Sequence, residues 1–282
     1  MADGRITVGT VNLGNLPKHW QILKELNREA SRATDQYRVN MDFTDRRFDE
    51  ATPTGRRIYF NAVHVLNVAE DNQLALEDML LNRGIPPFAA WSLIRPAFEN
   101  AFYAVWLLEP DDSRERCRRA LRMDWQEQRA HSVRLKLKIE LTHTEGTPAA
   151  LQAEAADREI RHRYENEAHK VGLGLPMLRA KINLTAELPK LTSLPAGDSG
   201  EVPRFHLLQW RMISGTQHGD VGAVLNLSDA EYRLPVPGGQ SATISVNDDS
   251  FIAACYSAAI MQWTALQLYI QRTTTHTGPS SR

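Results

Sequence analysis

The chain has few of the features that mark exported or membrane-embedded proteins. Only two of its 282 residues are cysteine, Cys117 and Cys255, and no CxxC pair occurs, so neither a disulfide framework nor a cysteine-based zinc site is predicted. No run approaches the ~18 uninterrupted apolar residues of a membrane span; the stretch 97–108 contains Glu99 and Asn100. The first residues lack the continuous apolar core of a signal peptide. We expect a cytoplasmic protein that does not contact a membrane.

The chain also lacks an excess of charge and the common catalytic motifs. Its formal net charge is -1 and its sequence pI is near 6.8, so binding to nucleic acid or to an anionic surface must come from a local patch. No Walker motif, nucleophile elbow, kinase motif set or zinc-finger spacing is present, and Gly172-x-Gly174 lacks the strand and third glycine of a dinucleotide loop. Several large enzyme classes are disfavoured, and no cofactor is predicted.

Helical periodicity dominates what is present. Asn15 and Pro17 are typical of a helix start, and Gly84 is typical of a helix end. The segment 88–109 is apolar on nearly every face, which predicts a central buried helix that Pro96 interrupts or kinks. Helices are expected from 16 onward and over 54–84, 88–109, 114–142, 147–170, 177–184, 204–217 and 248–270. Asp112 or Ser113, Thr147, and one of Asp248, Asp249 and Ser250 are expected at the starts of three of these helices.

The segments between these helices complete the prediction. Residues 42–53 resemble a charged loop, and 232–246 resemble a β-hairpin. Residues 189–203 have a flexible composition, suited to a lid, a linker or a simple loop, and 273–282 are expected to fray. Without βαβ alternation, the sequence predicts one mainly α domain over 1–282, a helical bundle of seven or eight helices with a small β-hairpin near the C-terminus.

Charged residues interrupt the most apolar helix. Arg95 and Glu99 are four residues apart and can pair, because buried charges are tolerated mainly when they are paired and hydrogen-bonded. One interpretation is an internal ion pair that fixes helix register. The other is a polar pocket in the bundle core, with Asp124, Ser214 and His218 converging on the same place.

The segment from Arg211 to His218 suggests a chemistry. An arginine can stabilise a charged phosphoryl transition state while a histidine transfers a proton, and seven residues are nearly two helical turns, so both side chains share a face. The Arg-x6-His spacing resembles HEPN-type helical ribonucleases, which implies RNA as the substrate and a homodimer as the assembly. Met212 and Gly215 depart from that pattern, and three Arg-x4-6-His spacings occur where about 2.5 are expected by chance.

Carboxylate and histidine pairs raise the alternative of a metal-dependent helical-bundle oxidase, since di-iron bundles use Glu-x-x-His on helices. Five pairs have facing helical spacing, against about 4 expected at random, so the sequence assigns no metal ligand. The pairs are Glu127/His131, Glu140/His143, Glu159/His162, Glu165/His162 and Glu165/His169.

A basic stretch follows the apolar helix. Nine cations oppose four carboxylates between 113 and 140, a local balance of +5, which suits either a solvated helix face or a surface that follows phosphates. The cations are Arg114, Arg116, Arg118, Arg119, Arg122, Arg129, Arg134, Lys136 and Lys138, and the carboxylates are Glu115, Asp124, Glu127 and Glu140.

Two blocks of the sequence resemble a known group. Trp91-Ser-Leu-Ile-Arg95-Pro-Ala-Phe-Glu99-Asn100, with 104–110 and 114–122, resembles an uncharacterised group of helical actinobacterial proteins, and 210–219 resembles that group's second shared block. The resemblance covers about a fifth of the chain and implies a helical fold but no activity. The sequence hypothesis is therefore a HEPN-like RNA-directed nuclease or toxin, with a non-catalytic ligand-binding or protein-interaction module as the alternative.

Overall fold

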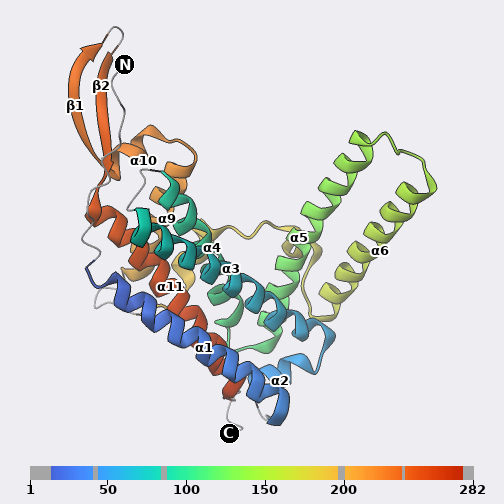
Figure 1. Cartoon of the computed structure of the whole chain (residues 1–282). Coiled ribbons are helices and arrows are strands. Elements are labelled where there is room, and N and C mark those ends of the chain that lie inside the picture. The colour runs from blue at the N-terminus through green and yellow to red at the C-terminus, as the bar shows by residue number, and fades with distance from the viewer. Residues whose placement is uncertain (1–13, 41–43, 84–87, 196–200, 237–238, 276–282) are drawn as a thin grey trace.

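The computed structural model describes residues 14–40, 44–83, 88–195, 201–236 and 239–275. The predicted fold class is confirmed, because these residues form eleven α-helices, one short 3-10 helix and a two-stranded antiparallel sheet near the C-terminus (Figure 1). Seven helices are long: α1 Leu16–Asn40, α3 Pro53–Arg83, α4 Ala89–Leu108, α5 Ser113–Leu141, α6 Pro148–Lys170, α9 Val202–Gln217 and α11 Asp248–Thr274. Four are short: α2 Asp45–Glu50, α7 Leu175–Arg179, α8 Leu184–Glu187 and α10 Val221–Asn226; η1 Leu188–Lys190 is the 3-10 helix.

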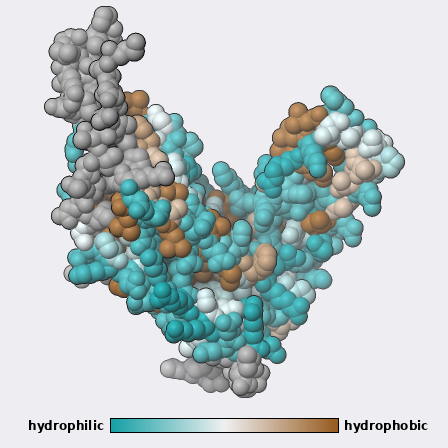
Figure 2. Space-filling view, in the orientation of Figure 1, coloured by the Kyte–Doolittle hydropathy of each residue, from teal (hydrophilic) through white to brown (hydrophobic). Residues whose placement is uncertain are grey.

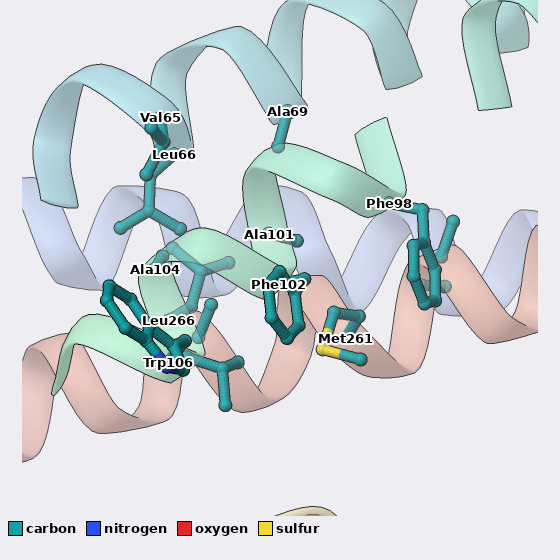
Figure 3. Close-up of a cluster of buried hydrophobic side chains, with 14 of the residues drawn as sticks. Val65, Leu66, Ala69, Phe98, Ala101, Phe102, Ala104, Trp106, Met261 and Leu266 are labelled. Atoms are coloured by element: carbon teal, nitrogen blue, oxygen red, sulfur yellow. The ribbon is translucent and has the colours of Figure 1, made fainter. Parts of the chain in front are cut away.

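Helix α4 is the centre of the core, as its composition predicts. It packs between α3 and α11, and α1 covers α11 from outside (Figure 3). Phe98, Phe102 and Trp106 are at most 1% exposed. Burying aromatic side chains of this size is among the larger contributions to stability, roughly 1.5–3 kcal/mol for a phenylalanine.

Helix α4 continues through Pro96, so the predicted interruption is wrong. Pro96 lacks the backbone N–H that would donate to the Ser92 carbonyl, and the packing of α4 against α3 and α11 stabilises the helix across this position.

Arginines from two other helices bind the carbonyl groups at the end of α4. Arg272 of α11 donates from Nε to the Leu108 carbonyl at 3.1 Å and from Nη2 to the Glu109 carbonyl at 2.9 Å. Arg116 of α5 donates from Nη1 to the Pro110 carbonyl at 2.7 Å. Positive groups are favourable here because the last carbonyls of a helix lack partners and carry partial negative charge.

The predicted loop 42–53 is wrong in part, because it contains α2. The two aspartates of α2 are buried. Asp49 pairs with Arg116 at 2.9 Å, and Asp45 pairs with Arg272 at 2.7 Å. Sequence reasoning assigned these charges to solvent, as is usual for unpaired aspartates, whereas arginines more than 60 residues away in the chain neutralise them.

Other boundaries moved by a few residues. The predicted helix 177–184 is instead α7 and α8, separated by four residues. Helix α11 extends past 270 to Thr274, and Asn247 rather than an aspartate supplies its N-cap, accepting from the Ser250 N–H at 2.9 Å.

Parts of five predicted segments lie outside the described residues, including 42–43 of the predicted loop and 237–238 of the predicted hairpin. Gly84, residues 196–200 of the predicted 189–203 loop and residues 276–282 of the predicted tail are among them. Around these gaps, Leu191, Leu194 and Thr273 are buried.

Two features project from the bundle (Figure 1). Strands β1 Ser228–Val236 and β2 Gly239–Val246 pair from Ser228↔Val246 to Val236↔Gly239, with an irregularity between Tyr232 and Leu234. Helices α5 and α6 form a hairpin, here called the arm, which diverges from the bundle and gives the molecule a V-shaped outline in Figure 2. A second apolar cluster fixes the base of the arm; it comprises Leu121, Trp125, Ala168, Leu173 and Leu178.

Helix α11 is the one helix in the described ranges that is long and apolar enough to cross a membrane. The test concerns length and composition only, and 67% of its apolar window is buried inside the protein. Core helices of globular proteins commonly have this character.

Candidate functional site

The partly exposed edge of α4 carries the polar side chains that interrupt its apolar pattern. Arg95, Glu99, Asn100 and Tyr103 recur at three- and four-residue spacing and are all half-buried. From Arg95 to Tyr103 the helix rises about 12 Å. Two different groups of residues meet this edge, one at each end.

The first group is the Arg95 cluster, which comprises Arg95, Glu99, Trp210, Gln217 and His218. Arg95 donates from Nε to Glu99 at 2.7 Å and from Nη1 to the Gln217 side-chain carbonyl at 3.0 Å. The indole N–H of Trp210 donates to the same Glu99 oxygen at 2.8 Å. The cluster therefore joins the two sequence blocks for which a family resemblance was noted.

His218 completes the Arg95 cluster from the end of α9. Its Nε2 lies 3.2 Å from Nη1 of Arg95. A guanidinium can only donate, so Nε2 accepts, and the neutral imidazole in this arrangement carries its proton on Nδ1. His218 is exposed to solvent.

A tight turn places His218 at this point. The backbone N–H of His218 closes α9 onto the Ser214 carbonyl, Gly219 has φ +72°, and Asp220 caps α10 by accepting from the Gly222 N–H at 2.8 Å. A Cβ on Gly215 would lie 2.7 Å from that of Ala223. The glycine that departs from the HEPN pattern is thus required by the close approach of α10.

Arg211 and Ser214, also predicted for the site, lie on α9 beside this turn. Arg211 is exposed and makes no hydrogen bond or ion pair within the described part of the chain. Ser214 is half-buried and contributes its backbone carbonyl to the His218 turn. Six residues are predicted for the site: Arg95, Glu99, Asp124, Arg211, Ser214 and His218. In the structure, side-chain hydrogen bonds connect three of them, because Arg95 contacts both Glu99 and His218.

Asp124 belongs to the second group, at the other end of the α4 edge. It accepts from Nη1 of Arg57 at 2.8 Å and from the amide of Asn61 at 2.6 Å. Arg57 also binds Glu167 of α6 at 3.0 Å. Burial raises the pKa of Asp124, while the Asn61 hydrogen bond and the Arg57 charge lower it, and the balance is a raised pKa.

A cavity of about 230 Å³ lies beside Asp124. Tyr103 lines this cavity and lies near the Glu99 carboxylate of the Arg95 cluster. Burial, and then the Glu99 charge, raise the pKa of Tyr103. The lining carries two carboxylates and no lysine or arginine; it comprises Asn61, His64, Val65, Asn100, Tyr103, Met123, Asp124, Gln126, Glu127 and Ile182.

Sequence reasoning missed Gln217, Arg57 and Glu167 as partners of the site residues. Arg57 lies 67 residues from Asp124, and no periodicity connects positions so far apart. The indole of Trp210 gave a usable signal, because a half-buried tryptophan usually finds an acceptor for its N–H.

The described residues contain no group of three or more His, Cys, Asp or Glu side chains placed to hold a metal ion. Of the pairs that suggested an oxidase, all four histidines are exposed, and Glu165 alone among the carboxylates is half-buried. The inward-facing pairs which that alternative needs are therefore not found. Both cysteines are buried and free, and burial raises the pKa of Cys117 to about 11.

His206 and Ser257 form a buried pair that resembles part of a hydrolase site. His206 Nδ1 lies 2.6 Å from the Ser257 hydroxyl, and both side chains are 0% exposed. Burial lowers the pKa of His206 to about 4. Because solvent does not reach the pair, we assign it to the core.

Comparisons of the chain with protein-family models, with curated proteins and with solved structures find no match.

Proposed function

We propose that the protein is an RNA-directed nuclease or toxin in which Arg211 and His218 are catalytic and Arg95 is a further phosphate-binding residue. The observation that carries the proposal is the contact between the Arg95 guanidinium and the exposed His218 imidazole, at 3.2 Å, with Arg211 two turns earlier on the same face of α9.

The chemistry follows from the partners of Arg95. Nε of Arg95 is held by Glu99, while Nη1 faces Gln217 and His218. A phosphate oxygen is charged and is a stronger acceptor for a guanidinium than a neutral imidazole nitrogen. When RNA binds, Nη1 of Arg95 is thus expected to donate to a phosphate oxygen instead of to His218. Nε2 of His218 is then available to accept a proton.

The reaction then needs two proton transfers and one exchange of bonds at phosphorus. Nε2 of His218 removes the proton of a ribose 2′-hydroxyl, and the 2′-oxygen bonds to the adjacent phosphorus. The bond from phosphorus to the 5′-oxygen breaks, and that oxygen takes a proton from water or from the imidazolium. A 2′,3′-cyclic phosphate and a 5′-hydroxyl result. Arg95 and Arg211 stabilise the negative charge that develops on the phosphoryl oxygens.

An RNA-cleavage assay on metal-free protein tests the proposal. We expect cleavage by the wild type and a loss of about 100-fold or more in His218→Ala and in Arg211→Ala, with all variants folded by circular dichroism. His162→Ala, which removes an exposed histidine from α6, is the matched control and is expected to retain activity. An inactive wild type over a broad panel of RNAs would contradict the proposal.

A second candidate is a protein-interaction module, and the arm supports it. Apolar side chains that are at least 50% exposed gather on α5 and α6: Val133, Leu137, Leu141 and Leu151 (Figure 2). Exposed apolar patches of this kind commonly mark contact surfaces. In this proposal a second copy of the chain covers them, which also matches the homodimer expected from the sequence.

The mass of the protein in solution tests this candidate. Light scattering after size-exclusion chromatography is expected to give a dimer for the wild type and a monomer for Leu137→Glu/Leu141→Glu. Leu81→Glu places a single glutamate on an exposed leucine outside the arm and is expected to leave the dimer intact. We place either function in the cytoplasm, on the basis of the two free, buried cysteines.

A further inference from the structure

The side of the arm that faces α7 contains a basic hollow of about 420 Å³. Four cations line it, Arg129 and Lys136 from α5, Arg161 from α6 and Arg179 from α7, against a single carboxylate, Glu165. Four positive charges less one negative leave +3. The basic stretch of the sequence supplies two of these cations, and the fold adds the other two.

Two of the cations are already paired. Arg179 donates to Glu165 at 2.5 Å, and Arg161 lies 3.1 Å from Asp157. Arg129 and Lys136 make no hydrogen bond or ion pair with any described residue. They are seven residues apart on one helix, so both side chains lie on the same face, above the same hollow.

Asp157 cannot neutralise this remaining charge. It is 5% exposed and accepts from the Ser132 hydroxyl at 2.6 Å and from the Gln128 amide at 2.7 Å, in addition to its contact with Arg161. Burial raises the pKa of Asp157, but the Ser132 hydrogen bond and the Arg161 charge outweigh it, and the pKa is lowered. Its oxygens are therefore used within the arm.

A buried tryptophan lines the hollow. Trp125 is 7% exposed and belongs to the apolar cluster at the base of the arm, and the Arg179 guanidinium lies 5.9 Å from its ring centre. Arg179 thus contacts both Trp125 and Glu165, whereas no hydrogen bond or ion pair with a described residue engages Arg129 or Lys136. This arrangement differs from a solvated helix face, where charges of both signs alternate.

We propose that this hollow binds a multiply charged phosphate ligand. Its space equals that of on the order of ten water molecules, which suits two or more linked phosphates better than one small carboxylate. Arginine and lysine together supply both forked and point-charge donors for phosphate oxygens. The ligand is either a free polyphosphate group, as in a nucleoside diphosphate, or consecutive phosphates of an RNA strand. The site stands independently of the nuclease proposal.

Isothermal titration calorimetry at low ionic strength tests the site with two probes, inorganic pyrophosphate and a short oligoribonucleotide. Arg129→Gln/Lys136→Gln is expected to weaken binding by at least about tenfold, since two charge-assisted hydrogen bonds are lost, and to reduce the salt dependence of RNA binding by about two phosphate contacts. Arg134→Gln/Lys138→Gln removes the same charge from exposed positions of α5 outside the hollow and is expected to bind like the wild type.

The two probes distinguish the two sources of phosphate. Binding of pyrophosphate with the expected pattern of variants supports a free polyphosphate ligand, and binding of RNA alone supports a strand. A wild type that binds neither probe at millimolar concentration overturns the site. Equal losses in both double variants also overturn it, because diffuse charge would then account for binding. Pyrophosphate has no ribose 2′-hydroxyl for the nuclease to act on, so its binding tests the hollow whether or not the nuclease proposal holds.

Discussion

At the scale of single residues, stability depends on charged side chains that are buried away from solvent. Asp49 and Arg116 are paired with side-chain exposures of 0% and 1%, and Asp49 also accepts from Tyr59 at 2.9 Å and from Ser113. Removing one member of such a pair leaves the other buried without compensation, which costs more than the intact pair contributes.

Arg116→Ala is expected to lower the free energy of unfolding by about 3–5 kcal/mol, as measured by urea denaturation. Arg114→Ala, at an exposed position two residues earlier, should change it by less than about 0.5 kcal/mol. A loss of less than about 1 kcal/mol in Arg116→Ala would show that Asp49 is satisfied without its arginine.

His206 predicts a pH dependence with a definite sign. Its folded pKa of about 4 lies below the ordinary histidine value of 6.5, so the unfolded chain binds the extra proton first as pH falls. Stability is therefore lost between about pH 6.5 and pH 4 and changes no further below that. The shift corresponds to about 3 kcal/mol.

Denaturation curves of wild type and His206→Leu across this pH range check the prediction. The variant should lose less stability on acidification, by about 2–3 kcal/mol, and His162→Gln, an exposed histidine, should behave like the wild type. Parallel curves for His206→Leu and wild type would contradict a neutral buried His206.

At the scale of elements, the contact between α9 and α10 positions the Arg95 cluster. Gly215 allows the Ala223 methyl group to approach the backbone of α9, and the turn through Gly219 then presents His218 to Arg95. The short α10 thereby positions His218, although no hydrogen bond among the described residues connects α10 to Arg95.

Gly215→Ala is expected to destabilise the protein by about 1 kcal/mol, because overpacking outweighs the better helix propensity of alanine. In thermal unfolding, a double-mutant cycle with Ala223→Gly should give a coupling energy of about 1 kcal/mol or more, since the methyl group introduced at position 215 would lie against that of Ala223. Additive effects of the two substitutions would mean that α10 can move away from α9 at little cost.

At the scale of the whole molecule, the arm differs from the bundle in how much it buries. Helix α4 has twelve buried residues, whereas the 23-residue α6 has three, Ala150, Asp157 and Ala168. Regions with few buried contacts open at lower free energy than the core.

In a monomer, hydrogen exchange should therefore be faster in residues 130–160 than in α4 and α11, by about 100-fold or more, as measured by mass spectrometry on the isolated protein. Equal protection of the arm and the core would indicate that a second copy covers the arm. Leu137→Glu/Leu141→Glu should then restore fast exchange.

Local patterns in the sequence determined the helices. The apolar composition of 88–109 gave the central position of α4, the spacing of Arg95 and Glu99 gave their ion pair, and cap residues such as Asp112 and Thr147 gave helix starts. Each of these depends on residues within one or two turns, where the geometry of the helix is known in advance.

Only the tertiary structure decided which distant charges meet. It placed Asp45 and Asp49 in the core beside Arg272 and Arg116, directed Asp124 to Arg57 rather than to Arg95, and gathered Arg129, Lys136, Arg161 and Arg179 around one hollow. Sequence alone cannot decide these pairings, because any exposed arginine is an equally suitable partner for an aspartate until packing removes both from water.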